Sequence, residues 1–305
     1  MAEPAPFFIV GSARSGTTFL RLTMNAHPQV AVPPESRFIT ELHEGRDEVD
    51  VDEFLDRLAQ HKRFAAWELP IGSVREKLSG RTRVGYAEAI SAAYLAYAEA
   101  QGKQRWGDKT PRYVENIPEL ASLFPEARFI HLIRDGRDVA LSYADVPFGP
   151  KNVAKAAELW ANRVARGIRD GRELERGRYI EIMYSDLVED NEGEIKDICS
   201  FLALDFDPAM LDPEKTKKGA LARAERFNPH VKEQPIRRVR SWKTDMPPEH
   251  IEIFEAIAGD VLSELGFERR FPSPGLSARI KARAGIAGLP VARVRSRARA
   301  AEGPS

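Results

Sequence analysis

Short apolar runs alternate with longer amphipathic segments through most of the chain. The apolar runs that predict buried strands lie at residues 7–11, 128–135 and 178–188. Apolar residues spaced three and four positions apart predict helices at 17–26, 52–61, 86–102, 136–144, 156–175, 192–204 and 249–267. Strands that alternate with long helices form parallel sheets covered by helices on both faces. The pattern therefore predicts an α/β fold built around a central parallel sheet.

The first apolar run leads into FFIVGSARSGTTFL, residues 7–20, which predicts a strand, a glycine-rich loop and a helix. Gly11 lets the chain leave the strand sharply, and Gly16 lets the backbone approach an anion closely. The helix that starts near Thr17 directs its free N–H groups and the positive end of its dipole at that anion. Thr17 and Thr18 add hydroxyl donors. The segment therefore predicts a cradle for a phosphate or a similar oxyanion.

This loop differs from a Walker loop at one position. The spacing from Gly11 to Gly16 is the same, but Thr17 stands where the Walker loop has its lysine. Without this lysine a γ-phosphate is harder to position. Arg14 instead brings a planar, permanently charged group from inside the loop, and this group suits oxyanions.

Composition is ordinary for a globular protein, with 43% hydrophobic and 30% charged residues in a chain of 305. The single cysteine, Cys199, argues against an internal disulfide and a cysteine-based metal site, and it indicates a reducing compartment. The N-terminus lacks the features of a secretory signal. No stretch approaches the roughly 18 apolar residues of a membrane span. These observations predict a cytoplasmic protein.

Charge is distributed unevenly, although the formal net charge is zero. Residues 273–305 contain seven Lys/Arg and one Glu, a net charge of +6, which leaves −6 for residues 1–272. The Ala, Arg and Gly content of this tail, interrupted by Pro290, predicts a solvated and disordered extension of one domain that spans residues 1–272. A contact of the basic tail with a membrane surface or an acidic partner is the alternative.

The segment ARSGTTFLRLTMNAHPQVAVPPESRF, residues 13–38, resembles the sulfate-donor loop of sulfotransferases that use 3′-phosphoadenylylsulfate (PAPS). It is similar to the tyrosylprotein sulfotransferases and their bacterial relatives, and further blocks of resemblance follow in order to about residue 268. The resemblance implies a P-loop-like, three-layer α/β sandwich. PAPS has no transferable γ-phosphate, so the missing lysine fits. The loop residues implied to bind the donor are Arg14, Ser15, Gly16, Thr17 and Thr18.

The segment RFIHLIRDGRDVALSY resembles the motif that holds the 3′-phosphate of PAPS, with Arg134 at a strand end and Ser142 on the next helix. Parallel sheets bind ligands at the carboxyl ends of their strands, and arginine can bond a phosphate with two N–H groups. A surface ion-pair cluster of Arg134, Asp135 and Arg137 is the alternative. Tyr184 resembles a tyrosine near the adenine of the donor, with a core tyrosine as its alternative.

The resemblance also implies three catalytic residues. Glu35, in PPESR, stands where the family has the glutamate that removes the proton of the acceptor. Lys109, in WGDKTPRY, matches the lysine that stabilises charge on the leaving oxygen, and Arg14 is implied to act at the transferring sulfate. A solvated loop glutamate and a surface lysine are the alternatives.

The segment ERFNPHVKEQPIRRVRSWKTDMP resembles the part of the family that folds over the nucleotide, with Trp242 as its anchor. Here the pattern departs from the family, because Asn228 replaces a serine and Ser241 replaces a lysine. The residues that could contact the 3′-phosphate in their place are Arg238, Arg240 and Lys243.

These observations predict a sulfotransferase that moves a sulfuryl group from PAPS to a hydroxyl, or to an amine, by in-line displacement without a metal. The acceptor is a small molecule, a glycan or a lipid. Residues 44–100 do not match the tyrosylprotein enzymes, which argues against a peptide. No nucleic-acid partner is expected, and the oligomeric state stays open. The alternatives are a P-loop kinase, with Asp135 holding Mg²⁺, and a non-catalytic nucleotide-binding protein.

Overall fold

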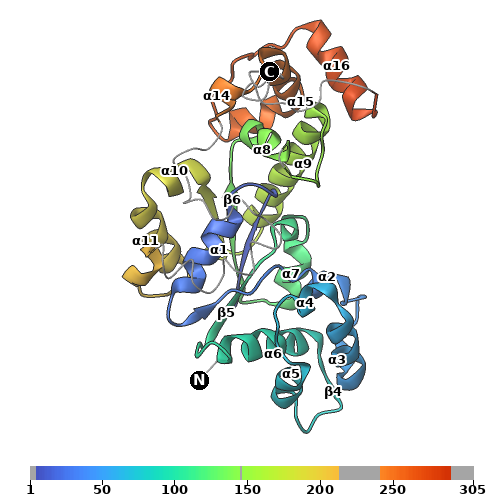
Figure 1. Cartoon of the computed structure of the whole chain (residues 1–305), viewed down its shortest axis with the longest axis vertical. Coiled ribbons are helices and arrows are strands. Elements are labelled where there is room, and N and C mark those ends of the chain that lie inside the picture. Colours follow the sequence, from blue (N-terminus) through green and yellow to red (C-terminus); the bar gives the residue numbers. More distant parts are fainter. Residues whose placement is uncertain (1–4, 145, 213–240, 290–305) are drawn as a thin grey trace, which may run out of the picture.

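The computed structural model describes residues 5–144, 146–212 and 241–289. Its centre is a parallel sheet of five strands in the order β2-β5-β1-β6-β7 (Figure 1). These strands are β1 (Phe7–Gly11), β2 (Val30–Ala31), β5 (Arg105–Lys109), β6 (Arg128–Ile133) and β7 (Tyr179–Met183). A separate antiparallel pair consists of β3 (Glu48–Asp50) and β4 (Arg83–Gly85). The central parallel sheet expected from the sequence is confirmed.

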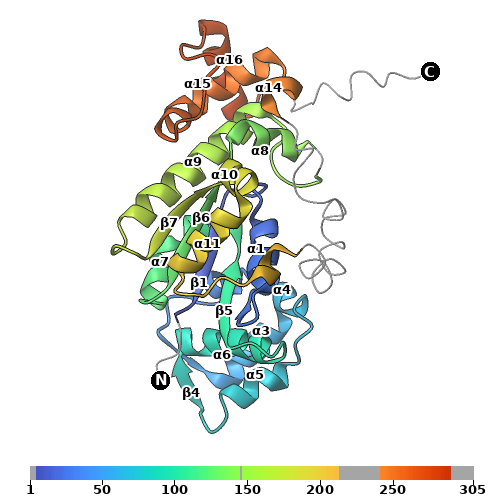
Figure 2. The same ribbon diagram turned by 90° about the vertical axis from the view of Figure 1, so that its left-hand side faces the viewer.

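Helices connect the strands and cover both faces of the sheet (Figure 2). The helices before β6 are α1 (Thr17–Ala26), α2 (Phe38–Glu41), α3 (Val51–Gln60), α4 (Lys62–Ala65), α5 (Ile71–Lys77), α6 (Tyr86–Glu99), the 3₁₀ helix η1 (Pro111–Glu115) and α7 (Ile117–Leu123). Those after β6 are α8 (Gly136–Tyr143), α9 (Val153–Arg172), α10 (Tyr184–Glu189), α11 (Asn191–Phe201), the 3₁₀ helix η2 (Pro208–Leu211), α14 (Trp242–Asp245), α15 (Pro248–Glu264) and α16 (Leu276–Ile286).

The central strand β1 contributes to both layers of the core. Phe8 and Val10 belong to the apolar cluster formed with α6, η1 and α7, whereas Phe7 and Ile9 belong to the cluster formed with α1 and α11. Successive side chains of a strand point to opposite faces of the sheet. Because both faces are covered, all four side chains are buried, and the strand has the continuous apolar sequence of a central parallel strand.

The strand β5 is not evident from the apolar pattern. Its sequence, RWGDK, contains one large apolar residue, Trp106, yet it lies between β2 and β1. A Cβ at Gly107 would come within 2.4 Å of the Phe7 ring, so glycine is required for the close packing of this strand. The expected ends of two other strands were too late: β6 ends at Ile133, and the chain is helical from Tyr184 onward. The last pair of residues between β6 and β7 is Ile133 with Met183. After Met183 the chain continues as helix α10.

The C-terminal helices form a third apolar cluster, in which α15 and α16 pack against each other and against α9. Residues 276–286 lie in the tail expected to be disordered, but they form the helix α16. Its buried residues Ala278, Ala282 and Gly285 are small, so the helix can approach its neighbours closely. The domain boundary at residue 272 stays a prediction. Among the described residues, no helix is both long enough and apolar enough to cross a bilayer.

Candidate active site

The loop between β1 and α1 has the geometry of an anion cradle. Gly16 is the N-cap of α1, with a φ of 95°, and no side chain caps the helix. The first N–H groups of a helix have no partner within the helix, so they are available to a ligand. A Cβ at Gly16 would come within 2.4 Å of the ring of Tyr184, so glycine is required here by conformation and by space. Ser15 is fully buried, and its hydroxyl has no hydrogen-bond partner among the described residues.

Two neighbouring strands bring the predicted donor residues together. Gly11 at the end of β1 pairs with Leu132 near the end of β6, so the segments that follow lie side by side. The Nε of Arg14 donates a hydrogen bond of 2.9 Å to the Oγ of Ser142 on α8, although the two residues are 128 positions apart. A guanidinium N–H of Arg134 donates to the carbonyl of Arg14 at 3.4 Å. These contacts join the loop to the motif that follows β6.

Tyr184 completes this cluster from the third strand. It is the first residue of α10, directly after β7, and its ring lies 4.8 Å from the guanidinium carbon of Arg134. The side chain is partly exposed and touches the position of Gly16. Tyr184 is therefore part of the loop's surroundings and is not a residue of the deep core.

Lys109 and Glu35 form an ion pair at the end of β5. The Nζ of Lys109 donates to the Oε1 of Glu35 at 2.7 Å, and a guanidinium nitrogen of Arg63 on α4 lies 4.0 Å from the other carboxylate oxygen. The Lys109 side chain is 5% exposed and that of Glu35 is 27% exposed. Both residues are therefore held in place, and the alternatives of a solvated glutamate and a surface lysine do not describe this structure.

Burial and charge act in opposite directions on this pair. Burial alone would raise the pKa of Glu35, but Lys109, Arg63 and Arg37 outweigh it and lower the pKa below its usual value. Burial also lowers the pKa of Lys109, although Glu35 opposes this change. Glu35 is therefore a carboxylate at neutral pH, which is the form that can accept a proton.

Hydrogen bonds attach the Glu35 segment to the residues after β5. The backbone N–H of Ser36 donates to the Oγ1 of Thr110 at 3.1 Å, and its hydroxyl lies 3.0 Å from the hydroxyl of Tyr113. Arg37 follows with a φ of 56°, a left-handed conformation that is costly for a residue with a side chain. Arg14 has the same kind of conformation, with a φ of 75°. Arg14 lies in the loop between β1 and α1, and Arg37 lies in the loop between β2 and α2.

The residue before Lys109 on β5 is a buried acid. Asp108 is fully buried, and its Oδ2 accepts a hydrogen bond of 2.6 Å from the hydroxyl of Tyr94 on α6. Burial raises the pKa of Asp108 to about 6, although its hydrogen bonds and Lys109 act in the opposite direction. No local pattern in the sequence indicates Tyr94, Asp108 or Arg63, because each reaches the site only through the packing of the helical region and β5.

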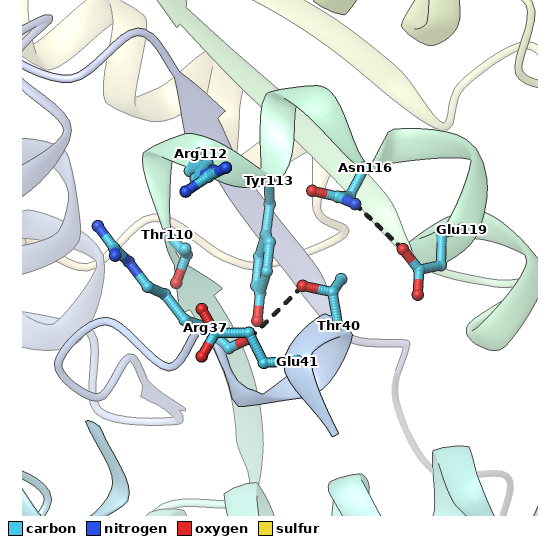
Figure 3. A pocket seen from close by; sticks show the side chains of 8 residues that line it. All are labelled: Arg37, Thr40, Glu41, Thr110, Arg112, Tyr113, Asn116 and Glu119. Atoms are coloured by element: carbon cyan, nitrogen blue, oxygen red, sulfur yellow. Dashed lines mark hydrogen bonds between the residues drawn. The ribbon is translucent and has the colours of Figure 1, made fainter. Parts of the chain in front are cut away.

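A pocket of about 250 Å³ lies between residues 37–41 and residues that follow β5 (Figure 3). It includes Thr110, the neighbour of Lys109, and Arg37, two residues after Glu35. The complete lining is Arg37, Thr40, Glu41, Thr110, Arg112, Tyr113, Asn116 and Glu119. Each of these side chains carries a polar group, so the pocket suits a ligand with several hydrogen-bonding groups.

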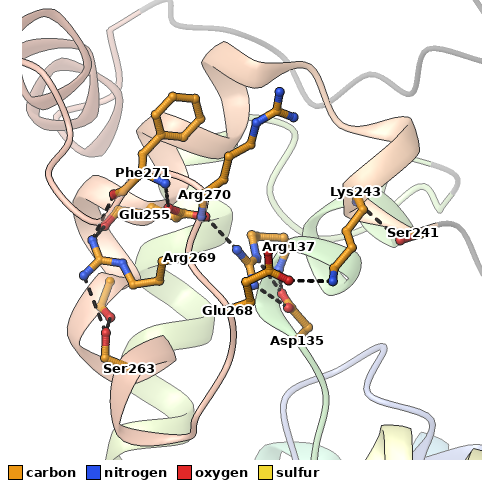
Figure 4. Close-up of polar contacts among 11 residues, drawn as sticks. Asp135, Arg137, Ser241, Lys243, Glu255, Ser263, Glu268, Arg269, Arg270 and Phe271 are labelled. Atoms are coloured by element: carbon orange, nitrogen blue, oxygen red, sulfur yellow. Dashed lines mark hydrogen bonds and ion pairs between the residues drawn. The ribbon is translucent and has the colours of Figure 1, made fainter.

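Arg137, three residues after Arg134, forms a buried cluster with Asp135 and Glu255 (Figure 4). Arg137 is fully buried, bonds Asp135 on its own segment, and donates to the Oε1 of Glu255 on α15 at 2.6 Å. Its guanidinium carbon lies 3.5 Å from the centre of the Trp242 ring. Arg134 instead turns toward the loop. The alternative of a surface ion-pair cluster is therefore wrong, because Arg134 and Arg137 have different partners and Arg137 is inside the protein.

The segment before Trp242 lies mostly outside the described residues. This applies to the predictions on Asn228, Arg238 and Arg240. Lys243 is described, and its Nζ pairs with the Oε2 of Glu268 at 2.6 Å. The backbone N–H of Trp242 donates to the carboxylate of Asp138 on α8 at 2.7 Å, so the end of this segment is attached near Arg134. Among the described residues, no group of three potential metal ligands is present.

The fold is that of α/β proteins with a glycine-rich loop between the first strand and the first helix. A family model described as "Sulfotransferase family" matches residues 6–208, which is more than half of the chain. The chain is 30% identical over 295 residues to the nodulation protein NoeE of Sinorhizobium fredii, a match that covers 88% of this chain and 67% of that protein. The chain therefore belongs to the sulfotransferase family, as its motifs predict.

More distant relatives and solved structures agree with this assignment. The protein-tyrosine sulfotransferase of Drosophila melanogaster is 25% identical over 273 residues, and the chain spans only 51% of its length. The sulfotransferase domain of the curacin biosynthetic pathway has a TM-score of 0.56 at 19% identity, covering 87% of this chain and 99% of that one. A sulfotransferase domain of the Synechococcus PCC 7002 olefin synthase has a TM-score of 0.50 at 24% identity, covering 79% and 92%. The likeness confirms the P-loop-like α/β fold.

Proposed function

We propose that this enzyme transfers a sulfuryl group from PAPS to a hydroxyl, or to an amine, of its acceptor. The observation that carries the proposal is the convergence of three predicted groups at the carboxyl edge of the sheet. These groups are the loop after β1, the Arg134 motif after β6, and the Glu35–Lys109 pair at the end of β5. Parallel sheets bind ligands at this edge.

The chemistry of the loop fits the donor. The glycine at position 16, the open N-terminus of α1 and the buried hydroxyl of Ser15 suit the oxygens of a phosphate or a sulfate. The hydroxyl groups of Thr17 and Thr18 would add hydrogen-bond donors on the first turn of α1. Arg134 and Ser142 would bind the 3′-phosphate, and Tyr184 would lie beside the nucleotide. The hydrogen bond between Arg14 and Ser142 supports this arrangement, because it joins the sulfate side of the site to the 3′-phosphate side.

The reaction breaks one bond and forms one. The acceptor oxygen forms a bond to sulfur as the bond between sulfur and the bridging oxygen breaks, and adenosine 3′,5′-bisphosphate leaves. Glu35 takes the proton of the acceptor, since its carboxylate carries no proton at neutral pH and its basicity rises when Lys109 moves away. Lys109 and Arg14 stabilise the negative charge on the bridging oxygen and on the transferring sulfate. The ion pair between Lys109 and Glu35 opens so that each group can reach its partner in the reaction.

The two alternative functions have weaker support. A kinase would need Asp135 for Mg²⁺, but this carboxylate already accepts hydrogen bonds from Arg137 through both oxygens. A protein that only binds a nucleotide would need neither Glu35 nor Lys109. The acceptor is not identified, although the polar pocket lined by Arg37 and Thr110 suits a molecule with several polar groups.

Calorimetry tests the donor site. We expect the protein to bind adenosine 3′,5′-bisphosphate without a metal and to lose this binding in Arg134→Ala. Arg163→Ala is the matched control, because Arg163 is also partly buried but pairs with Glu115 on η1. A preference for ADP with Mg²⁺ would reject the sulfotransferase mechanism and favour a kinase.

A further inference from the structure

The C-terminal helix α16 carries an unusual exposed apolar surface. Among the described residues, five large apolar side chains are exposed, and four of them lie within residues 276–289. Leu276 is 75% exposed and Ile280 is 58% exposed, and the other two are Ile286 at 36% and Leu289 at 58%. Single exposed apolar residues are ordinary on a protein surface, but four in one short segment mark an interaction surface.

The helix has distinct faces. With 3.6 residues per turn, Leu276 and Ile280 lie one above the other, and Arg279 and Arg283 form a second row beside them. The opposite face carries the small residues that pack against the body of the protein: Ala278, Ala282 and Gly285. The apolar and the basic rows therefore face outward together, on the side that none of the described residues covers.

The described part of this segment is positively charged. Residues 273–289 contain Arg279, Lys281 and Arg283 and no acidic residue. Lys281 pairs with Glu249 on α15. In the part of the chain that the structure describes, Arg279 and Arg283 have no carboxylate within ion-pair distance. Their charges are therefore available to an anionic partner.

We propose that α16 docks on the surface of an anionic lipid bilayer, with Leu276 and Ile280 in the interface and Arg279 and Arg283 among the headgroups. Helices with this combination of apolar and basic rows lie in the plane of a membrane surface. Four apolar side chains are too few for a stable protein–protein interface, which buries about 1,200–2,000 Å². The helix lies at the opposite end of the molecule from β4 and α3 (Figure 1), so docking leaves that end open.

Flotation with vesicles tests the proposal on the full chain. We expect binding to vesicles of phosphatidylcholine with phosphatidylserine, no binding to phosphatidylcholine alone, and weaker binding at raised salt. Each Lys or Arg near an anionic surface contributes about 1 kcal/mol, so Arg279→Gln with Arg283→Gln should weaken binding about thirtyfold. Leu276→Ser with Ile280→Ser should also weaken it. Both pairs are exposed, so folding should be unaffected.

The matched control removes the same charge at the other end of the molecule. Arg46→Gln with Arg83→Gln changes two exposed arginines, one of them on β4, and should leave vesicle binding unchanged. Equal binding to neutral and anionic vesicles, equal losses in both arginine pairs, or no binding at all would overturn the proposal. A dimer that forms with rising concentration and disappears in the Leu276→Ser, Ile280→Ser variant would also overturn it, because a second copy would then cover this surface.

Discussion

The ammonium group of Lys109 lies 2.7 Å from the carboxylate of Glu35, so the two proposed catalytic groups form an ion pair with each other in the absence of substrates. The pair connects the loop after β2 to the end of β5, at residues 74 positions apart. The pair lowers the pKa of Glu35, and it holds Lys109 at the carboxyl end of β5, on the same edge of the sheet as the loop after β1. Replacing either partner should therefore change both the rate of the reaction and its dependence on pH.

Glu35→Gln should lower kcat by about 10²- to 10⁴-fold, because an amide cannot take the proton of the acceptor. Binding of adenosine 3′,5′-bisphosphate should remain unchanged, since Glu35 is assigned to the acceptor side. Release of the bisphosphate from PAPS measures the rate, and calorimetry measures the binding. Glu48→Gln, an exposed carboxylate paired with Arg83, is the control and should keep the original rate. A Glu35→Gln enzyme with unchanged kcat would exclude Glu35 as the base.

Lys109→Met should move the acidic limb of the kcat/KM profile to higher pH. In the native protein burial raises the pKa of Glu35, but Lys109 and the nearby arginines outweigh this and lower it. The carboxylate is needed in its charged form, so activity is lost as the pH falls through its pKa. Without Lys109, less positive charge opposes the effect of burial, so the pKa of Glu35 rises. Activity is then lost at a higher pH.

The same profile provides an internal control. Arg63→Gln removes a cation that lies 4.0 Å from Glu35, so the shift should have the same direction and be smaller. If the acidic limb stays in place in both variants, a group other than Glu35 determines it.

The rate at the pH optimum should fall by about 10²- to 10³-fold in Lys109→Met, the loss typical of a missing hydrogen-bond donor to a developing oxyanion.

Gly16→Ala should weaken binding of adenosine 3′,5′-bisphosphate by about tenfold or more, a loss of about 1.4 kcal/mol. The new methyl group would lie 2.4 Å from the Tyr184 ring and would displace it or the loop. Gly45→Ala is the matched control, since Gly45 also has a left-handed backbone, with a φ of 71°, but has nothing within 4 Å. Both variants should lose about 1–2 kcal/mol of stability from backbone strain. If Gly16→Ala and Gly45→Ala bind adenosine 3′,5′-bisphosphate equally well, Tyr184 does not constrain the loop.

Arg137→Met should lower the free energy of unfolding by about 3–5 kcal/mol, because it leaves the buried carboxylate of Glu255 without its cation. Arg172→Met is the comparison: this arginine is 54% exposed and pairs with Glu181, so its loss should cost about 0–1 kcal/mol. Denaturant unfolding measures both. Similar values for the two variants would show that the buried cluster contributes little to stability.

Local sequence was sufficient for the parts of the fold that depend on neighbouring residues. The expected helix at 17–26 agrees with α1 at both ends, and the strand at 7–11 agrees with β1. Both elements carry strong apolar patterns, and the glycines between them fix the loop. The site residues Arg14, Glu35, Lys109, Arg134 and Ser142 were named from short motifs, and the assignment of their roles stays a prediction.

The sequence by itself determined the alternation of strands and helices and the composition of the anion loop, because both arise from apolar spacing and from the freedom of glycine over a few residues. Only the tertiary structure decided that RWGDK is an inner strand of the sheet, which forms because β1 and β2 pair with it and the Phe7 ring covers Gly107. It also decided that α16 is a helix, since its alanines gain burial only against α9 and α15. These outcomes depend on contacts between residues far apart in the chain, and a local pattern carries no information about such contacts.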